Sequence, residues 1–183
     1  MIPISLSTIS TLFQKDLMIP LHYLKYGIFY ACIYLLFSMT IHAFSNQKAL
    51  TRYTFPRFLL IIYFTILLQC LLIGHLAQPY TSFQLHNLLS SSPSAKLYAY
   101  VLEMVLIFIP FGILLPCSIR FFQHPFFCIF TGGFFSAVVE LLQPKLNHGV
   151  GRIDDFVLNT FGTILGYYIF YLFYRILSSL RKH

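Results

Sequence analysis

Charged residues are scarce in this sequence. Only 9% of its 183 residues are Asp, Glu, Lys or Arg, whereas a soluble domain has roughly 25%. Hydrophobic residues make up 58%, above the roughly 45–50% of soluble proteins. So few charges exclude an ordinary water-soluble globule, and a disordered chain needs high charge with low hydrophobicity. The composition therefore predicts an integral membrane protein.

Paired cysteine motifs and a concentrated basic stripe are also missing. The four cysteines lie inside apolar segments, without a CxxC motif or a Cys/His spacing typical of zinc sites. We therefore expect free thiols, no metal and no cofactor. The net charge of +7 is spread between apolar segments, which favours membrane-flanking charge over nucleic-acid binding. Membrane lipids, and no nucleic acid, are the expected partners.

Five apolar segments are each long enough to cross a membrane, which takes about 20 residues. They cover residues 26–44, 58–77, 97–119, 125–142 and 156–177. Their apolar character is continuous, which favours helices over the alternating strands of about ten residues found in β-barrels. We predict an all-α polytopic membrane protein with about five transmembrane helices. Residues 26–183 would form a single membrane domain, preceded by an interfacial tail at 1–25.

Lysine and arginine are distributed unevenly between the two sides of this predicted bundle. Five lie on the side of the N-terminus: Lys15, Lys25, Lys96, Lys145 and Arg152. Seven lie on the side of the C-terminus: Lys48, Arg52, Arg57, Arg120, Arg175, Arg181 and Lys182. Because cytoplasmic loops carry the excess of Lys and Arg, we predict an outside N-terminus and a cytoplasmic C-terminus.

Polar residues gather where the third helix starts, the fourth ends and the fifth starts. Helices that alternate in direction bring these three places to one end of the bundle. The predicted polar cluster consists of Glu103, Glu140, Gln143, Arg152, Asp154, Asp155 and Asn159. Ionisable groups near the membrane core are costly and are often functional. A purely structural explanation is also open, in which Arg152 pairs with Glu140 or Asp155 and an aspartate caps the fifth helix.

Small residues continue the same two helix faces toward the other side of the membrane. They are Gly132, Gly133 and Ser136 on the fourth helix, and the GxxxG pair Gly162 and Gly166 on the fifth. Such residues let helix backbones approach closely. We expect them to pack the fourth and fifth helices together as a tight hairpin.

Two parts of the chain resemble the VanZ-like family of small bacterial membrane proteins. They are IFIPFGILLP at 107–116, and VELLQ at 139–143 followed by RIDDFVLNTFGTILGY at 152–167. The family pattern falls on Glu140, Gln143, Asp155, Asn159, Gly162 and Gly166, within a VanZ-like core at about 97–177. Two positions depart from it: Met104 stands where members often carry Asn, and Arg152 is nearly adjacent to the two aspartates.

The resemblance implies a protein of the bacterial cytoplasmic membrane. The founding member is associated with resistance to teicoplanin, a lipoglycopeptide, so the resemblance implies a contribution to teicoplanin resistance or to cell-envelope homeostasis. The polar cluster would then face outward and bind a lipoglycopeptide or a lipid-linked cell-wall precursor. The oligomeric state stays open.

A membrane-embedded enzyme is the alternative interpretation. Glu140 and Asp155 would then act as acid and base on a lipid or a lipid-linked glycan. The sequence carries no Ser/His/Asp order, no metal-ligand set and no phosphate-binding glycine loop. We therefore favour a non-enzymatic role. A transporter would need to dimerise, because no internal repeat is present.

Overall fold

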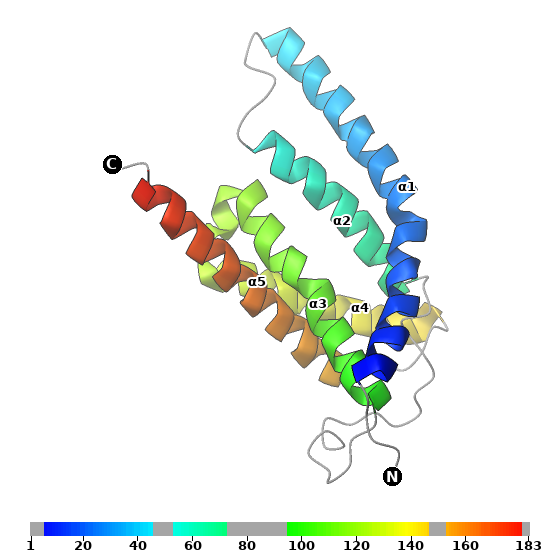
Figure 1. The fold of residues 1–183 in the computed structure, drawn as a ribbon. Coiled ribbons are helices and arrows are strands. Elements are labelled where there is room, and N and C mark those ends of the chain that lie inside the picture. The colour runs from blue at the N-terminus through cyan, green and yellow to red at the C-terminus, as the bar shows by residue number, and fades with distance from the viewer. Residues whose placement is uncertain (1–5, 46–52, 73–94, 147–152, 181–183) are drawn as a thin grey trace.

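The chain folds into a bundle of helices, as predicted. The computed structural model describes residues 6–45, 53–72, 95–146 and 153–180, and all secondary structure in these residues is helical. The elements are α1 (Leu6–Ser45), α2 (Thr54–Leu72), α3 (Ala95–Ser118), η2 (Arg120–Gln123), α4 (Pro125–Leu142), η3 (Gln143–Leu146) and α5 (Ile153–Leu180) (Figure 1).

Four of these helices are long and apolar enough to cross a membrane. The candidate spans among the described residues are Thr54–Leu71, Tyr98–Ser118, Pro125–Leu142 and Ile153–Leu180. The helix at Pro125–Leu142 has the predicted bounds. The helix α3 begins two residues before the predicted start and ends one residue before the predicted end, and α5 extends three residues beyond its prediction at each end. The helix α1 contains the predicted first span but begins already at Leu6. The interfacial placement of residues 1–25 stays a prediction.

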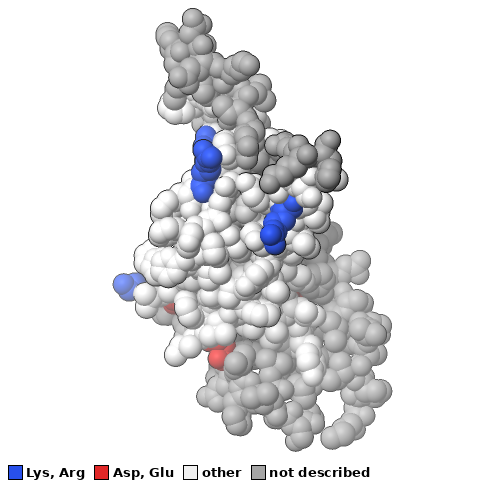
Figure 2. All heavy atoms as spheres, turned by 90° about the vertical axis from the view of Figure 1, so that its left-hand side faces the viewer, with Lys and Arg blue, Asp and Glu red and all other residues white. Residues whose placement is uncertain are grey.

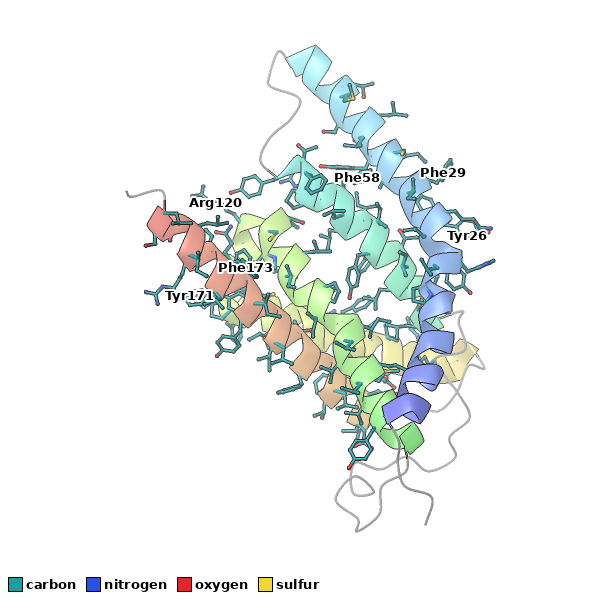
Figure 3. All side chains as sticks on the ribbon, viewed as in Figure 1. Tyr26, Phe29, Phe58, Arg120, Tyr171 and Phe173 are labelled. Carbon is teal, nitrogen blue, oxygen red and sulfur yellow. The ribbon has the colours of Figure 1, made fainter. Side chains whose placement is uncertain are left out.

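Large apolar side chains cover the outside of the bundle. Phe29 on α1, Phe130 on α4 and Phe173 on α5 are each 61% exposed. Figure 3 shows Tyr26 and Phe29 on the outer side of α1. Apolar patches on this scale would be an aggregation hazard in water. In a membrane they contact acyl chains.

The core lies around α3, which contacts each of the other four α-helices. Phe108 and Phe111 of α3 are 0% and 3% exposed. They pack in one cluster with Leu67 of α2, Val139 of α4 and Tyr167 of α5. This central position of α3 fixes the relative placement of α4 and α5.

Two backbone carbonyls of α3 accept hydrogen bonds from other helices, and Pro116 accounts for one of them. Pro116 has no N–H, so the Gly112 carbonyl loses its donor in the helix. The Cys128 thiol of α4 approaches that carbonyl oxygen at 3.9 Å. Near Pro110, the other proline of α3, the Tyr63 hydroxyl donates to the Ile107 carbonyl at 2.6 Å. The α3 backbone is thus tied to α2 and α4 inside the membrane.

Candidate functional site

Four polar residues form a stripe along α5. Asp155, Asn159, Thr163 and Tyr167 follow one another at intervals of four residues and therefore share one side of the helix. Their exposed fractions are 9%, 1%, 0% and 5%. The stripe faces protein rather than lipid, so neighbouring helices must satisfy its polar groups.

The helix α4 meets this stripe in an antiparallel register. Asn159 Nδ2 donates a hydrogen bond to Ser136 Oγ at 2.9 Å. Thr163 follows Asn159 by four residues on α5, and Gly132 precedes Ser136 by four residues on α4. Thr163 fills the space beside Gly132, where an added Cβ would overlap the threonine side chain. Ridges spaced by four residues on both helices therefore interlock.

The same register, extended four residues the other way, places Glu140 of α4 opposite Asp155 of α5. Each residue is only 9% exposed. Nearby carboxylates in a low-dielectric setting disfavour joint ionisation unless a proton or a positive group compensates them. We call the three successive pairs the α4–α5 ladder: Gly132–Thr163, Ser136–Asn159 and Glu140–Asp155.

Tyr100 of α3 also belongs to this site. Its hydroxyl donates a hydrogen bond to Asp155 Oδ1, and the residue is 8% exposed. The sequence analysis missed Tyr100, which is one of thirteen tyrosines in an apolar chain. The available signal was its spacing: Tyr100 precedes Glu103 by three residues and so lies on the same side of α3.

The Asn159 side chain is incompletely satisfied. Its Nδ2 is bonded to Ser136, whereas Oδ1 has no hydrogen-bond partner among the described residues, although it is buried. A buried polar atom without a partner costs about 1–3 kcal/mol. Asn159 lies one turn from Asp155 on α5.

The remaining acidic residues lie around the ladder. Glu103 is half-buried on α3. The helices α3 and α5 run parallel, with Val105 beside Gly162 and Ile109 beside Gly166. This offset puts Glu103 at the level of Asn159.

Four predicted cluster residues are not members of the α4–α5 ladder in the described structure: Glu103, Gln143, Asp154 and Arg152. Asp154 is half-exposed and its position in the helix turns it away from the direction of Asp155. Arg152 lies outside the described residues. Its predicted pairing with Glu140 or Asp155 therefore stays a prediction.

Gln143 ties the end of α4 to the end of α2. Its Nε2 donates to the Leu71 carbonyl at 3.1 Å, and the residue is 8% exposed. Carbonyls in the last turn of a helix lack donors within the helix. Gln143 thus satisfies one of them and positions the chain directly after Glu140.

The GxxxG pair of α5 corrects one expectation. An added Cβ at Gly162 would overlap the Val105 carbonyl, and one at Gly166 would overlap the Ile109 carbonyl. Both glycines thus pack against α3 and not against α4. The contact with α4 is made instead through Gly132 and Ser136, and Gly133 packs near Thr160 and Phe156 of α5. The hairpin prediction had placed all small residues in one contact, whereas α5 uses two neighbouring faces.

The opposite end of the bundle is basic. The Arg57 Nε donates to the Ser118 carbonyl at 3.2 Å, which satisfies the end of α3 and places a cation at its negative pole. The Tyr167 hydroxyl donates to the Gln123 carbonyl at 2.6 Å. In Figure 2 basic side chains lie in the upper part of the described surface, while one at the left edge lies at nearly the height of the visible acidic atoms. Acids and arginines therefore mark different ends.

The chemistry of the acidic end is that of hydrogen-bond acceptance. Glu140, Asp155 and the Asn159 Oδ1 carry acceptor oxygens, and the hydroxyl of Tyr100 already donates to Asp155. Within the described ranges, no group of three or more His, Cys, Asp or Glu side chains could hold a metal ion. The arrangement suits a ligand that carries several N–H or O–H donors.

Comparison with known proteins identifies one family. A family model described as VanZ/LLP1 matches residues 24–174. The match includes α2, α3 and α4 in full, residues 24–45 of α1 and residues 153–174 of α5. No curated protein and no solved structure matches the chain.

Proposed function

Because this chain belongs to the VanZ/LLP1 family, we propose that it contributes to low-level teicoplanin resistance or to cell-envelope homeostasis in the bacterial cytoplasmic membrane. It does so by binding, without catalysis, at the acidic end of the bundle. The ligand is a donor-rich headgroup of a lipoglycopeptide or of a lipid-linked cell-wall precursor.

The observation that carries the proposal is the opposition of Glu140 and Asp155 at the end of the α4–α5 ladder. Burying two carboxylates is costly. A purely structural ladder could end in small or amide residues, as its inner pairs do. Placing acceptors at this end creates a site that binds hydroxyl and amino groups, which are abundant on sugars and peptide headgroups.

The polar end faces outward in this proposal. Arg57, Arg120 and Arg175 belong to the other end, and the positive-inside rule assigns that end to the cytoplasm. From Asp155 to Arg175, α5 rises about 30 Å, which is the thickness of the hydrocarbon layer. The carboxylate pair is then at the outer headgroup boundary, where wall precursors and lipoglycopeptides are found.

Antibiotic susceptibility tests this function. A Gram-positive host expresses the wild type, Glu140→Gln, Asp154→Asn or an empty vector, with membrane abundance measured through a tag. We expect protection against teicoplanin but not vancomycin, its loss in Glu140→Gln and its retention in Asp154→Asn. Equal protection by an equally abundant Glu140→Gln variant contradicts the proposal.

The second candidate is an enzyme, and the Tyr100 hydrogen bond is the observation that favours it. A hydroxyl that donates to Asp155 stabilises the ionised form of this carboxylate. Glu140 would then hold the proton, so that one carboxyl acts as base and the other as acid. Turnover of a lipid-linked glycan by the purified protein, lost in Glu140→Gln, would favour catalysis over binding.

A further inference from the structure

We propose that the basic end of the bundle binds the phosphate of an anionic phospholipid between Arg57 of α2 and Arg120, the first residue of η2. This site goes beyond the proposed function, because it lies at the opposite end of the bundle from the α4–α5 ladder. Its occupant is a lipid whose headgroup carries a net negative charge, such as phosphatidylglycerol. The bound lipid stabilises the contact between α2 and α3.

The first argument is the charge of this end. Residues 45–57, 118–125 and 172–183 contain no Asp or Glu, and they hold seven basic residues: Lys48, Arg52, Arg57, Arg120, Arg175, Arg181 and Lys182. The acidic residues that the structure describes all belong to the other end: Glu103, Glu140, Asp154 and Asp155. These segments therefore supply no carboxylate to balance their cations. In a membrane, anionic lipids supply that charge.

The second argument is the position of the Arg57 guanidinium. Its Nε donates to the Ser118 carbonyl at 3.2 Å, and the group lies 5.9 Å from the centre of the Tyr53 ring. The side chain is exposed, and no ion pair or second side-chain hydrogen bond joins it to another described residue. A guanidinium has five N–H donors in a planar fork. The donors on its two terminal nitrogens can therefore bind a phosphate while Nε holds α3.

Arg120 lies close to the same point. It follows Ser118 by two residues, so at most about 7.6 Å separates the two Cα atoms. Figure 3 shows Arg120 at the end of α3, near the start of α2. Its side chain is exposed and has no hydrogen bond or ion pair with the rest of the described structure. A phosphodiester has two unesterified oxygens, so each arginine can donate to one of them.

Apolar surface adjoins the two arginines. Phe55 of α2 and Phe121 of η2 are 67% and 57% exposed, and the Phe121 ring lies 4.2 Å from that of Phe127 on α4. Exposed phenylalanines beside arginines are expected where acyl chains meet headgroups, because the arginine side chain reaches toward the polar layer. A phospholipid can bind the arginines through its phosphate and the phenylalanines through its acyl chains. A soluble phosphate offers only the first contact.

The test measures lipid selectivity by native mass spectrometry of the full chain in detergent. The chain is titrated with phosphatidylglycerol or with phosphatidylcholine of identical acyl chains, and the fraction that retains one lipid gives an apparent affinity for each. Each arginine near an anionic headgroup is expected to contribute about fivefold. We therefore expect phosphatidylglycerol to bind about 25-fold more tightly than phosphatidylcholine.

The variants assign this ratio to the two arginines. Arg120→Gln loses no hydrogen bond within the described structure and is expected to lower the ratio about fivefold. Arg120→Lys keeps the positive charge and is expected to keep most of the ratio. Arg57→Gln is expected to lower the ratio as much as Arg120→Gln. Its lost bond to Ser118 affects both lipids equally, so a loss of stability alone leaves the ratio unchanged.

Arg175→Gln is the matched control. It removes the same charge at the same end, but from α5, where the guanidinium lies 5.7 Å from the Tyr171 ring. We expect this variant to keep the wild-type ratio. An equal fall in Arg175→Gln and Arg120→Gln would show a general effect of net charge and would overturn the site.

Two further outcomes contradict the proposal. Equal affinities of the wild type for the two lipids would exclude recognition of a net negative headgroup. Soluble glycerol 3-phosphate is added as a competitor, and we expect it to leave the bound phosphatidylglycerol in place at the same concentration. Displacement by this soluble phosphate would overturn the lipid as the occupant.

Discussion

The two ends of the bundle use polar residues differently. At the basic end, Arg57 donates to the Ser118 carbonyl and Tyr167 donates to the Gln123 carbonyl. These bonds join side chains to backbone. At the acidic end, Gln143 likewise donates to a backbone carbonyl, that of Leu71, but Tyr100 donates to Asp155, which joins two side chains.

In the proposed function, this difference separates stabilisation from ligand recognition. Backbone carbonyls at helix ends need donors in every helical protein, so the bonds of the basic end have a sufficient structural reason. The acidic end leaves Asn159 Oδ1 without a partner among the described residues and opposes two buried carboxylates. A buried acceptor without a partner costs about 1–3 kcal/mol, and in the proposed function a bound ligand recovers that cost.

The largest expected effect comes from disrupting the α3–α5 contact, on which both ends of the bundle depend. Gly166→Leu would drive a side chain into the Ile109 carbonyl, and overpacking of this kind costs about 3 kcal/mol or more. We expect little monodisperse protein in size-exclusion chromatography after extraction. Phe173→Leu, at a residue 61% exposed on the same helix, is the control. A Gly166→Leu variant that folds as well as this control would contradict the close α3–α5 packing.

The next contrast compares one charge from each end. Arg57→Gln removes the charged donor from the end of α3 and is expected to lower stability by about 1 kcal/mol. Teicoplanin protection at matched abundance should persist in this variant and disappear in Glu140→Gln. The comparison of the two ends is wrong if both variants lose protection equally.

A smaller effect is expected from a substitution of Tyr100, which donates a hydrogen bond to Asp155. Tyr100→Phe removes the hydroxyl that donates to Asp155, at a cost of about 2 kcal/mol for a bond to a charged acceptor. We expect a partial loss of protection in broth-dilution assays. Tyr98→Phe, at a residue 39% exposed, makes the same chemical change outside the site. Matching results for the two variants would remove Tyr100 from the site.

The smallest effect is expected from a substitution at the basic end, Tyr167→Phe. Tyr167→Phe loses the 2.6 Å hydrogen bond to Gln123 and should lower stability by about 1 kcal/mol, with protection unchanged. Thermal unfolding in detergent measures the first quantity. Tyr168→Phe, at a residue 63% exposed, should unfold like the wild type. Loss of protection in Tyr167→Phe would show that the functional site reaches from the acidic end to the basic end of the bundle.

Much of the fold follows from local sequence. Apolar segments long enough to cross a membrane located α2 to α5, and Pro125 marks the first residue of α4 as a proline often does. Alternating helix directions were enough to place Glu103, Glu140 and Asp155 at one end.

The contacts inside the bundle depend on rotation about each helix axis, which spacing alone leaves open. Gly162 and Asn159 lie close together along α5, yet the first packs against α3 and the second bonds to α4. Tyr100 was missed for the same reason, because thirteen tyrosines in an apolar chain make one inward-facing hydroxyl inconspicuous.

The most direct test of the central claim is a double-mutant comparison of the carboxylate pair. Teicoplanin protection is measured for Glu140→Gln, Asp155→Asn and the double variant at equal membrane abundance. If Glu140 and Asp155 form one site, each single substitution removes as much protection as the double. Independent partial losses that add up in the double variant would contradict a shared site.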